Sequence, residues 1–455
     1  MLRGTAGAHS PPDRPSYSID GRAVAGADES LQAELRAAYS QRATGPRPRC
    51  RCIPGGVEMY IARIATNFHL KRMPGTGPDH AWSCPSFEPP AGLSGLGEVL
   101  GSAISEDPLD GSTTLKLGFP LTKVARKAPV IGEGAEPESV ATTGSRLSLR
   151  GLLHYLWEQA GFNRWTPAMS GKRSWPVVRK YLLEAAGGMT AKGAGLAALL
   201  FIPEPWNEQR KDEQAARRRA QLLRLASAPK GARRLMLLLG EVRRIEPSRY
   251  GHRLVVKHAP EVEFALNEDI YKAMRRRFET ELAFWDAQSH ADQRADGHLV
   301  VFGTFSVSLT GYPAMEELVL MFVTQNWIPV DDGFDLALLE ALTRSGHRFT
   351  RSLRYNLAPS QALATAVMPE TTPAPTALYI ARSGADPSFV AKAQEMAGNA
   401  GMATWLWETA EADLPPLPRR ETPAVGAGHA SGGATSAPAD GEVFNPWRAP
   451  AGAAN

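Results

Sequence analysis

The three cysteines of the 455-residue chain all lie in one short segment, and a histidine accompanies them. Cys50 and Cys52 are separated by one residue, and His80 precedes Cys84 by four positions. Thiolates and imidazoles are ligands of structural zinc, which takes four of them in a tetrahedron. The segment therefore predicts a structural Zn²⁺ site formed by Cys50, Cys52, His80 and Cys84.

The residues between the two ligand pairs predict a β-hairpin. GVEMYIAR and FHLKRM have the composition of two short strands, and IATN lies between them as the turn. A ligand pair, a hairpin and a second ligand pair are the layout of a zinc ribbon. Because so small a hairpin has little core of its own, a bound metal would stabilise it directly.

Alternatives to this ligand set remain open at the level of the sequence. Two ligands in a C-x-C pattern force a tighter turn than C-x-x-C, and His69 is a rival for the fourth position. Buried thiols without a metal, and redox or disulfide use, are further interpretations. In a catalytic site with three protein ligands, Glu58 or Asp79 could act as a base, although the chain has no H-E-x-x-H or deaminase pattern.

The composition indicates a protein with a sizeable core and no membrane span. The chain is 43% hydrophobic and 22% charged. No apolar run approaches the roughly 18 residues that a membrane helix needs, and the N-terminus lacks the apolar stretch of a secretory signal. We therefore expect a cytoplasmic protein without a membrane partner. The formal net charge of +4 permits contact with nucleic acid without requiring it.

Stretches rich in Pro, Gly and Ala divide the chain, and the elements between them predict a mixed α+β protein of several domains. The expected regions are a flexible N-terminus (1–48), a zinc-ribbon-like and β region (49–130), a linker (131–147), a helical, basic region (148–234), a mixed α/β domain (235–410) and a disordered tail (411–455). Within the N-terminal region, LQAELRAAYSQR predicts one short helix. The tail has too few apolar residues to offset its chain entropy.

The helical region is the first candidate for contact with nucleic acid. Its first helix has an N-cap at Ser148 and a stripe of apolar residues, and a second helix begins after Ser174. The pair predicts a helix-turn-helix-like bundle, with a plain helical bundle as the alternative. Basic residues that could contact nucleic acid are Lys172, Arg173, Arg179, Lys180, Arg217, Arg218 and Arg219. Acidic neighbours dilute the charge of the last three, so a solvated helix face is the simpler interpretation of that group.

The C-terminal block predicts a fold that nucleases share. From Phe334 to Glu408 the expected order is helix, strand, strand, strand, helix, strand, which resembles a restriction-endonuclease-like core. Such nucleases hold Mg²⁺ with an acidic residue on the second strand and a carboxylate-x-lysine pair on the third. Glu370 and Arg382 are weak counterparts, and Ile380 stands where the second carboxylate is needed. We therefore expect no nuclease activity from this block even if the fold is right.

Two long motifs resemble a known bacterial family. They are RCRCIPGGVEMYIARIATNFHLKRMPGTGPDHAWSCPSFEPP and LLHYLWEQAGFNRWTPAMSGKRSWPVVRKYLLEAA. The sequence is similar to the domain-of-unknown-function 1173 family from about residue 49 to about residue 407. The family is described by three N-terminal cysteines, which match Cys50, Cys52 and Cys84. Its members are met on plasmids and integrative conjugative elements of proteobacteria, so the resemblance implies a setting and no mechanism.

The sequence leads to three functional hypotheses. The first is an accessory protein of a mobile genetic element that carries structural zinc and binds DNA or other proteins of the element. The second is a divergent metal-dependent nuclease built on the C-terminal block, and the third is a pure protein–protein adaptor. Because no reaction motif is complete, the sequence favours a role other than catalysis.

Overall fold

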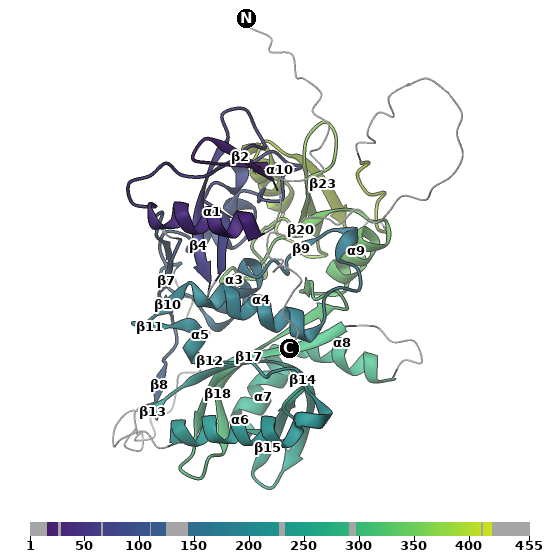
Figure 1. Cartoon of the computed structure of the whole chain (residues 1–455). Coiled ribbons are helices and arrows are strands. Elements are labelled where there is room, and N and C mark those ends of the chain that lie inside the picture. Colours follow the sequence, from purple (N-terminus) through teal and green to yellow (C-terminus); the bar gives the residue numbers. More distant parts are fainter. Residues whose placement is uncertain are drawn as a thin grey trace, which may run out of the picture.

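The structure is a computed structural model that describes residues 16–25, 29–64, 67–109, 111–123, 144–226, 233–290, 297–410 and 413–420. These residues form a mixed α+β protein with several sheets, as the sequence predicts (Figure 1). Most of the expected linker (131–147) and tail (411–455) lies outside the described residues.

The N-terminal residues form a five-stranded antiparallel sheet, although the sequence predicted a flexible segment up to residue 48. The elements are, in sheet order, β2 (Arg22–Ala25), β1 (Ser16–Ile19), β3 (Arg49–Cys50), β4 (Val57–Ile64) and β5 (Asn67–Arg72), with helix α1 (Glu29–Ser40) packed on them. The expectation fails because Ile19, Leu35 and Ala38 share a small core with Ile61 and Phe68. The hairpin β4–β5 and the helix α1 are where the sequence placed them.

A four-stranded sheet and several short elements follow. The sheet order is β11 (Ala194–Gly195), β10 (Met189–Ala191), β7 (Thr113–Leu115) and β6 (Ile104–Glu106). The short elements are η1 (Gly77–Asp79), η2 (Ala91–Leu93), α2 (Leu96–Val99) and β8 (Thr122–Lys123), which pairs with β13 (Arg233–Arg234). Strands β7 and β10 run parallel, so residues far apart in the chain meet here.

The central helices cross the middle of the molecule (Figure 1). The elements are α3 (Leu149–Gln159), β9 (Arg164–Trp165), η3 (Pro167–Met169), α4 (Trp175–Gly187) and α5 (Leu196–Leu199). The predicted N-cap of α3 is present, because Ser148 Oγ accepts the Gly151 N–H at 3.0 Å. A helix-turn-helix has a turn of about three or four residues. The connection here spans residues 160–174 and contains a strand, so the helix-turn-helix-like arrangement is not formed.

The third sheet is the largest and carries its own helices. Its strands are β12 (Leu200–Phe201), β14 (Met236–Ser248), β15 (Gly251–Val256), β16 (Glu263–Leu266), β17 (Gly297–Val307), β18 (Pro313–Thr324) and β19 (Pro329–Val330). The helices are η4 (Glu208–Arg210), α6 (Lys211–Ala226), α7 (Glu268–Arg277) and α8 (Glu279–His290). Strand β12 pairs with β14 and strand β19 pairs with β18. The other five strands form the main part of the sheet.

These five strands close into a small barrel. The first half of β14, residues 236–241, pairs with β17, and its second half, residues 242–248, pairs with β15, with a bulge between Val242 and Arg244. The bulge lets one strand serve both neighbours, because it bends and twists the strand locally. Ala265 of β16 pairs in parallel with Ala314 of β18, which closes the ring β14-β15-β16-β18-β17.

The C-terminal sheet has the element order that the sequence predicted. The elements are α9 (Gly333–Arg344), β20 (Phe349–Arg351), β21 (Ala366–Met368), β22 (Thr376–Ala381), α10 (Phe389–Asn399) and β23 (Ala403–Glu408). Strands β20, β21 and β22 are antiparallel neighbours, and β23 runs parallel to β22. Strand β9 joins the sheet beside β20, so the central and C-terminal regions share one sheet.

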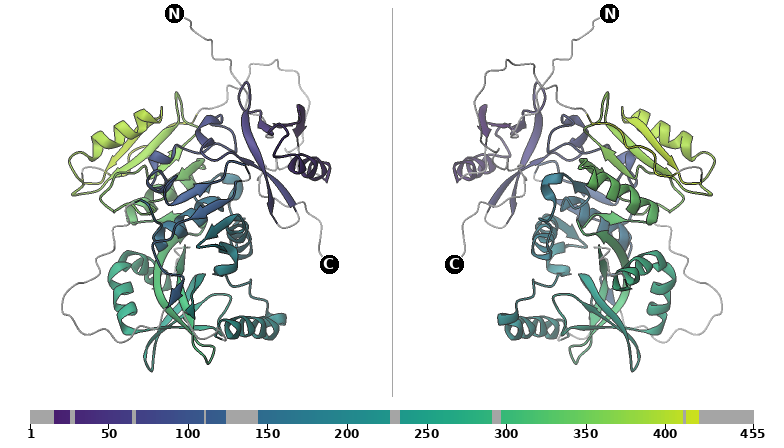
Figure 2. Two further views of the ribbon diagram at one scale, coloured as in Figure 1. Left: turned by 90° about the vertical axis from the view of Figure 1, so that its left-hand side faces the viewer. Right: turned by 90° about the vertical axis from the view of Figure 1, so that its right-hand side faces the viewer.

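The regions pack around a continuous hydrophobic core. The largest buried cluster runs from Val99 to Tyr355 in sequence and includes residues of α3, α4, β14, β17 and β18. It therefore crosses the boundary expected near residue 234. The N-terminal sheet and the C-terminal sheet lie on opposite sides above the barrel, and α6 projects beside it (Figure 2).

Candidate functional sites

The predicted metal ligands meet at the end of β3, the central strand of the N-terminal sheet. Cys50 ends β3, and Cys52 lies in the turn that leads to β4. His80 follows η1 directly, and Cys84 lies in the next turn. The hairpin β4–β5 separates the two pairs in sequence, and the return of the chain brings them together in space.

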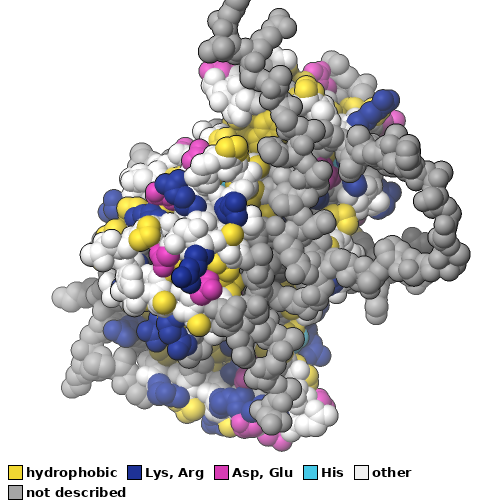
Figure 3. Space-filling view, turned by 45° about the horizontal axis from the view of Figure 1, so that its top comes forward, with side chains coloured by type: hydrophobic (Ala, Val, Ile, Leu, Met, Phe, Trp, Pro, Cys, Tyr) yellow, Lys and Arg dark blue, Asp and Glu magenta, His cyan; other side chains and the backbone are white. Residues whose placement is uncertain are grey.

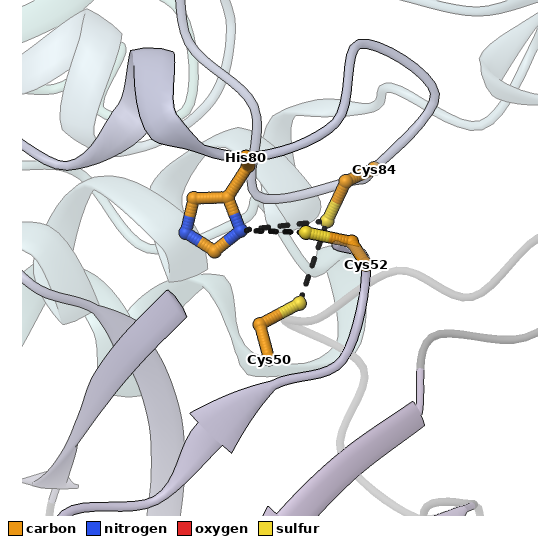
Figure 4. Close-up of side chains that lie close together, drawn as sticks. All are labelled: Cys50, Cys52, His80 and Cys84. Carbon is orange, nitrogen blue, oxygen red and sulfur yellow. Dashed lines mark hydrogen bonds between the residues drawn. The ribbon is translucent and has the colours of Figure 1, made fainter. Parts of the chain in front are cut away.

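The ligand atoms of the four residues converge on one point (Figure 4). All lie within 4.8 Å of one another. Sγ of Cys50 is 3.6 Å from Sγ of Cys84, and Nδ1 of His80 is 3.4 Å from Sγ of Cys52 and 3.7 Å from Sγ of Cys84. A disulfide needs an S–S length near 2.05 Å, so these cysteines are free thiols. The cluster could hold a metal ion.

The surroundings favour one thiolate within the cluster. Hydrogen bonds from Cys50, from His80 and from the Ser86 N–H lower the pKa of Cys84 well below its usual value, against the effect of burial. The hydrogen bond to Cys84, together with burial, raises the pKa of Cys50. Burial is also the main cause of the raised pKa of Cys52. A cation at the centre of the cluster would favour the thiolate form of all three.

The rival ligand His69 lies elsewhere. It sits on β5 opposite Ala62 and is not among the residues whose ligand atoms converge. Burial lowers its pKa, as expected for a ring packed on a sheet. The structure thus places His80 with the cysteines, and it places Glu58 in ion pairs with Arg47 and Arg49.

The seven basic residues predicted to contact nucleic acid do not form one surface. Arg173 is turned inward and donates hydrogen bonds to the carbonyl groups of Phe162, Asn326 and Gly161 at 2.8–3.3 Å. It also lies near the ring of Trp165, so its role is structural. Lys172 and Arg219 are exposed, and Lys180 pairs with Glu184 on its own helix. Arg179, Arg217 and Arg218 line one pocket between α4 and α6.

The two weak nuclease candidates lie at opposite ends of the antiparallel pair β21–β22. Glu370 follows β21 and contacts His347, Arg420 and the Arg348 N–H. Arg382 follows β22, which is antiparallel to β21, and it pairs with Asp332 and Asp335 instead. The structure therefore does not bring Glu370 and Arg382 into one site.

Exposed side chains on two turns at one end of the barrel were missed by the sequence analysis. Tyr250 in the β14–β15 turn is 79% exposed, and Leu309 and Tyr312 in the β17–β18 turn are 79% and 72% exposed. The guanidinium of Arg249 lies 5.2 Å from the Tyr250 ring centroid. The signal was available in the turns SRYG and LTGY, each of which places a tyrosine beside a glycine between two apolar runs.

Strand register brings the two turns to the same end of the barrel. His252, just after the first turn, pairs with Leu266, and the neighbouring Ala265 pairs with Ala314, just after the second turn. Figure 2 shows both hairpins projecting at the lower end of the molecule. We refer to Arg249, Tyr250, Leu309 and Tyr312 together as the barrel tip.

Comparison with known proteins places the chain in one family. A family model described as protein of unknown function (DUF1173) matches residues 17–410, so the chain belongs to this family and the resemblance seen in its motifs is confirmed. No curated protein and no solved structure gives a significant match. Within the described residues, no helix is long and apolar enough to cross a membrane.

Proposed function

We propose that the protein binds single-stranded nucleic acid at its barrel tip, and that a structural zinc ion stabilises its N-terminal sheet. The observation that carries the proposal is the pair of exposed tyrosines on two turns that strand register places at the same end of the barrel. DNA is the ligand that we favour, because the family resemblance implies a mobile genetic element. An accessory role in such an element is part of the proposal.

The connectivity of the barrel supports this proposal. Counted along the chain, its five strands are arranged 1-2-3-5-4 and close between 1 and 4, with helices α7 and α8 between the third and the fourth. This is the connectivity of the OB-fold, a Greek-key barrel that binds oligonucleotides through strands 2 and 3 and the loops between strands 1–2 and 4–5. The barrel tip consists of these two loops.

The chemistry of the barrel tip suits unpaired bases. A tyrosine ring offers a flat surface on which any base can stack, and such stacking contributes about 1–3 kcal/mol per base. Arg249 supplies a positive charge for the phosphate backbone, and it makes no ion pair within the described part of the chain. By contrast, Arg253 on the adjacent strand is neutralised by Glu246 and Glu263. The charge of Arg249 is therefore available for phosphate at the tip.

Duplex DNA is a less suitable ligand for the surfaces observed. The helices that would have formed a helix-turn-helix are joined by a long connection, and α3 is buried along most of its length. The face in Figure 3 intersperses Lys and Arg side chains with Asp and Glu. A long basic surface that could follow a duplex is not seen on that face. Stacking of unpaired bases on the exposed tyrosine rings is therefore the better-supported source of affinity.

The zinc part of the proposal rests on the cysteine–histidine cluster. With Zn–S bonds of about 2.3 Å, the edge of a regular tetrahedron is about 3.8 Å. The sulfur and nitrogen separations of 3.4–3.7 Å are close to this edge. Four protein ligands leave no open position for water, so the ion would have a structural role. It would join the turn after β3 to the loop after η1, in the manner of a zinc ribbon.

Binding of a fluorescent oligothymidylate of roughly 20 nucleotides tests the function, since OB-folds cover about 4–16 nucleotides. We expect fluorescence anisotropy to show binding that weakens as salt rises. A duplex of the same length should compete poorly. Equal competition by the duplex, or no binding of the single strand at low salt, would overturn the proposal.

A further inference from the structure

A pocket lies between α4, β12 and α6, apart from both sites described above. Its volume is about 640 Å³, which is within the range of about 300–1,000 Å³ that small-molecule sites occupy. One wall is apolar and includes Leu183, Leu200, Ile202, Leu225 and Met236. The other wall is strongly basic.

Four arginines line the basic wall against a single carboxylate. Arg179 comes from α4, and Arg217, Arg218 and Arg224 come from α6, whereas Glu204 is the one acidic residue in the lining. The lining thus has a formal excess of three positive charges. Arg217 pairs with Glu204 at 2.9 Å, so the carboxylate is already engaged.

Arg218 is the residue that indicates a ligand. It is only 4% exposed, and Nε donates to Glu261 at 2.5 Å. Nη1 and Nη2 are buried and find no hydrogen-bond partner in the described part of the chain. Nη1 is 3.8 Å from Glu204, which is too long for a hydrogen bond. Buried donors of this kind are usually satisfied in folded proteins, so the free edge of this guanidinium requires an acceptor.

We propose that the pocket binds a small phosphomonoester with an apolar or aromatic body. Nη1 and Nη2 of Arg218 have almost no accessible surface in this structure, so the side chain would have to shift for its free edge to reach the phosphate. A guanidinium then matches two phosphate oxygens at once. Arg224 and Arg217 would add charge at the mouth. The body of the ligand would cover the apolar wall formed by Leu183, Leu225 and Met236. This proposal is independent of the barrel tip.

Calorimetric titration of the full-length protein tests the pocket. The probes are inorganic phosphate, adenosine, adenosine monophosphate and octyl phosphate. We expect adenosine monophosphate, octyl phosphate or both to bind more tightly than inorganic phosphate and adenosine. Inorganic phosphate lacks the apolar or aromatic body, and adenosine lacks the phosphate. A comparison of adenosine monophosphate with octyl phosphate shows whether the pocket prefers a nucleotide or a lipid-like phosphate.

Variants of α6 locate the binding. Arg218→Lys keeps a charge beside Glu261 but loses the two-donor edge, and we expect a loss of about 10- to 100-fold in affinity. Ala220→Trp, at an exposed position of the pocket lining, should block the pocket without removing any arginine. Arg219→Gln is the matched control, because Arg219 is exposed on the same helix and is absent from the lining.

The outcomes decide the proposal in either direction. Loss of binding in Ala220→Trp with retention in Arg219→Gln supports it, even if Arg218→Lys folds poorly. The proposal is wrong if neither phosphomonoester binds the wild-type protein at millimolar concentration. It is also wrong if Ala220→Trp and Arg219→Gln bind equally well.

Discussion

At the scale of single residues, the N-terminal sheet carries a set of possible metal donors and a small core around them. The three thiols and His80 form a compact donor set, and Tyr17, Val57 and Met59 enclose the cysteines in a small core. This core is small, so it stabilises this end of the sheet only weakly by itself. The metal would therefore contribute directly to the stability of this part of the protein.

Replacing a ligand should remove the metal. We expect Cys84→Ser to lower the zinc content of purified protein from about one ion per chain to near zero, because a structural site needs all four ligands. Inductively coupled plasma mass spectrometry measures the content. His69→Gln is the control and should retain the ion, since His69 lies outside the cluster. Equal zinc content in the two variants would contradict the assignment.

His154 should make stability sensitive to acid. Its Nδ1 accepts the Tyr355 N–H at 3.0 Å, and burial together with Arg150 lowers its pKa to about 3. The unfolded chain, with a pKa near 6.5, binds the proton more readily. The folded protein therefore holds His154 in its neutral form, and this group does not reduce the free energy of unfolding above about pH 6.5. As the pH falls from 6.5 toward 3, the free energy of unfolding decreases by up to about 1.4 kcal/mol per pH unit.

The glutamine variant measures this contribution. Gln can still accept a hydrogen bond but does not titrate, so His154→Gln should lose less stability than the wild type between pH 6.5 and pH 4.5. The expected difference is up to about 2.7 kcal/mol, from two pH units at one proton. Urea unfolding at each pH gives the free energies. Parallel pH profiles for the two proteins would show that His154 is not the titrating group.

At the scale of elements, the barrel depends on the tight turn that carries Tyr250. Gly251 has φ +97°, and a Cβ placed there would lie 2.5 Å from the Leu266 carbonyl oxygen. The glycine thus allows β15 to approach β16 closely beside the turn. This contact helps to hold the first turn next to the second.

A methyl group at this position should disturb the turn. We expect Gly251→Ala to lower the free energy of unfolding by about 1–3 kcal/mol, because both the backbone conformation and the close contact are unfavourable. Gly187→Ala is the control. Gly187 is the last residue of α4 and has open space around it, so alanine should be neutral or slightly stabilising. Thermal unfolding of both variants provides the comparison, and equal stability would contradict the account of the turn.

The helices and strands that could be predicted from the sequence are those whose residue pattern lies within a short stretch of the chain. The hairpin β4–β5, the helix α3 with its Ser148 cap and the C-terminal element order follow from short-range patterns. Strands β1 and β2 have only four residues each, and the pattern of so short a segment does not show that α1 will cover it. The metal ligands were predictable because cysteine is rare in this chain.

At the scale of the whole molecule, the features missed by sequence analysis depend on contacts between distant residues. The barrel closes through pairs such as Met236 with Phe305 and Ala265 with Ala314, which no local pattern specifies. The pocket likewise joins α4 to α6. Arg173 illustrates the converse, because a basic residue expected on the surface is half-buried and donates a hydrogen bond to the carbonyl group of the distant Asn326.

Buried charges connect α9 and the loop before it to the C-terminal sheet. Asp335 at the start of α9 contacts Arg351 of β20 and Arg382 beyond β22, and Arg351 also contacts Asp331. Asp335 and Arg351 are each 1% exposed. This arrangement explains why Arg382 is occupied by structural contacts and does not form a nuclease-like site with Glu370.

The most direct test of the central claim is the affinity for oligothymidylate after both barrel-tip tyrosines are replaced. The account predicts that Tyr250→Ala/Tyr312→Ala loses about 2–6 kcal/mol of binding free energy, since each ring stacks one base at about 1–3 kcal/mol. Leu109→Ala, which changes an exposed apolar residue outside the barrel, should bind as the wild type does. Wild-type affinity in the folded double variant would contradict the claim that the barrel tip binds the strand.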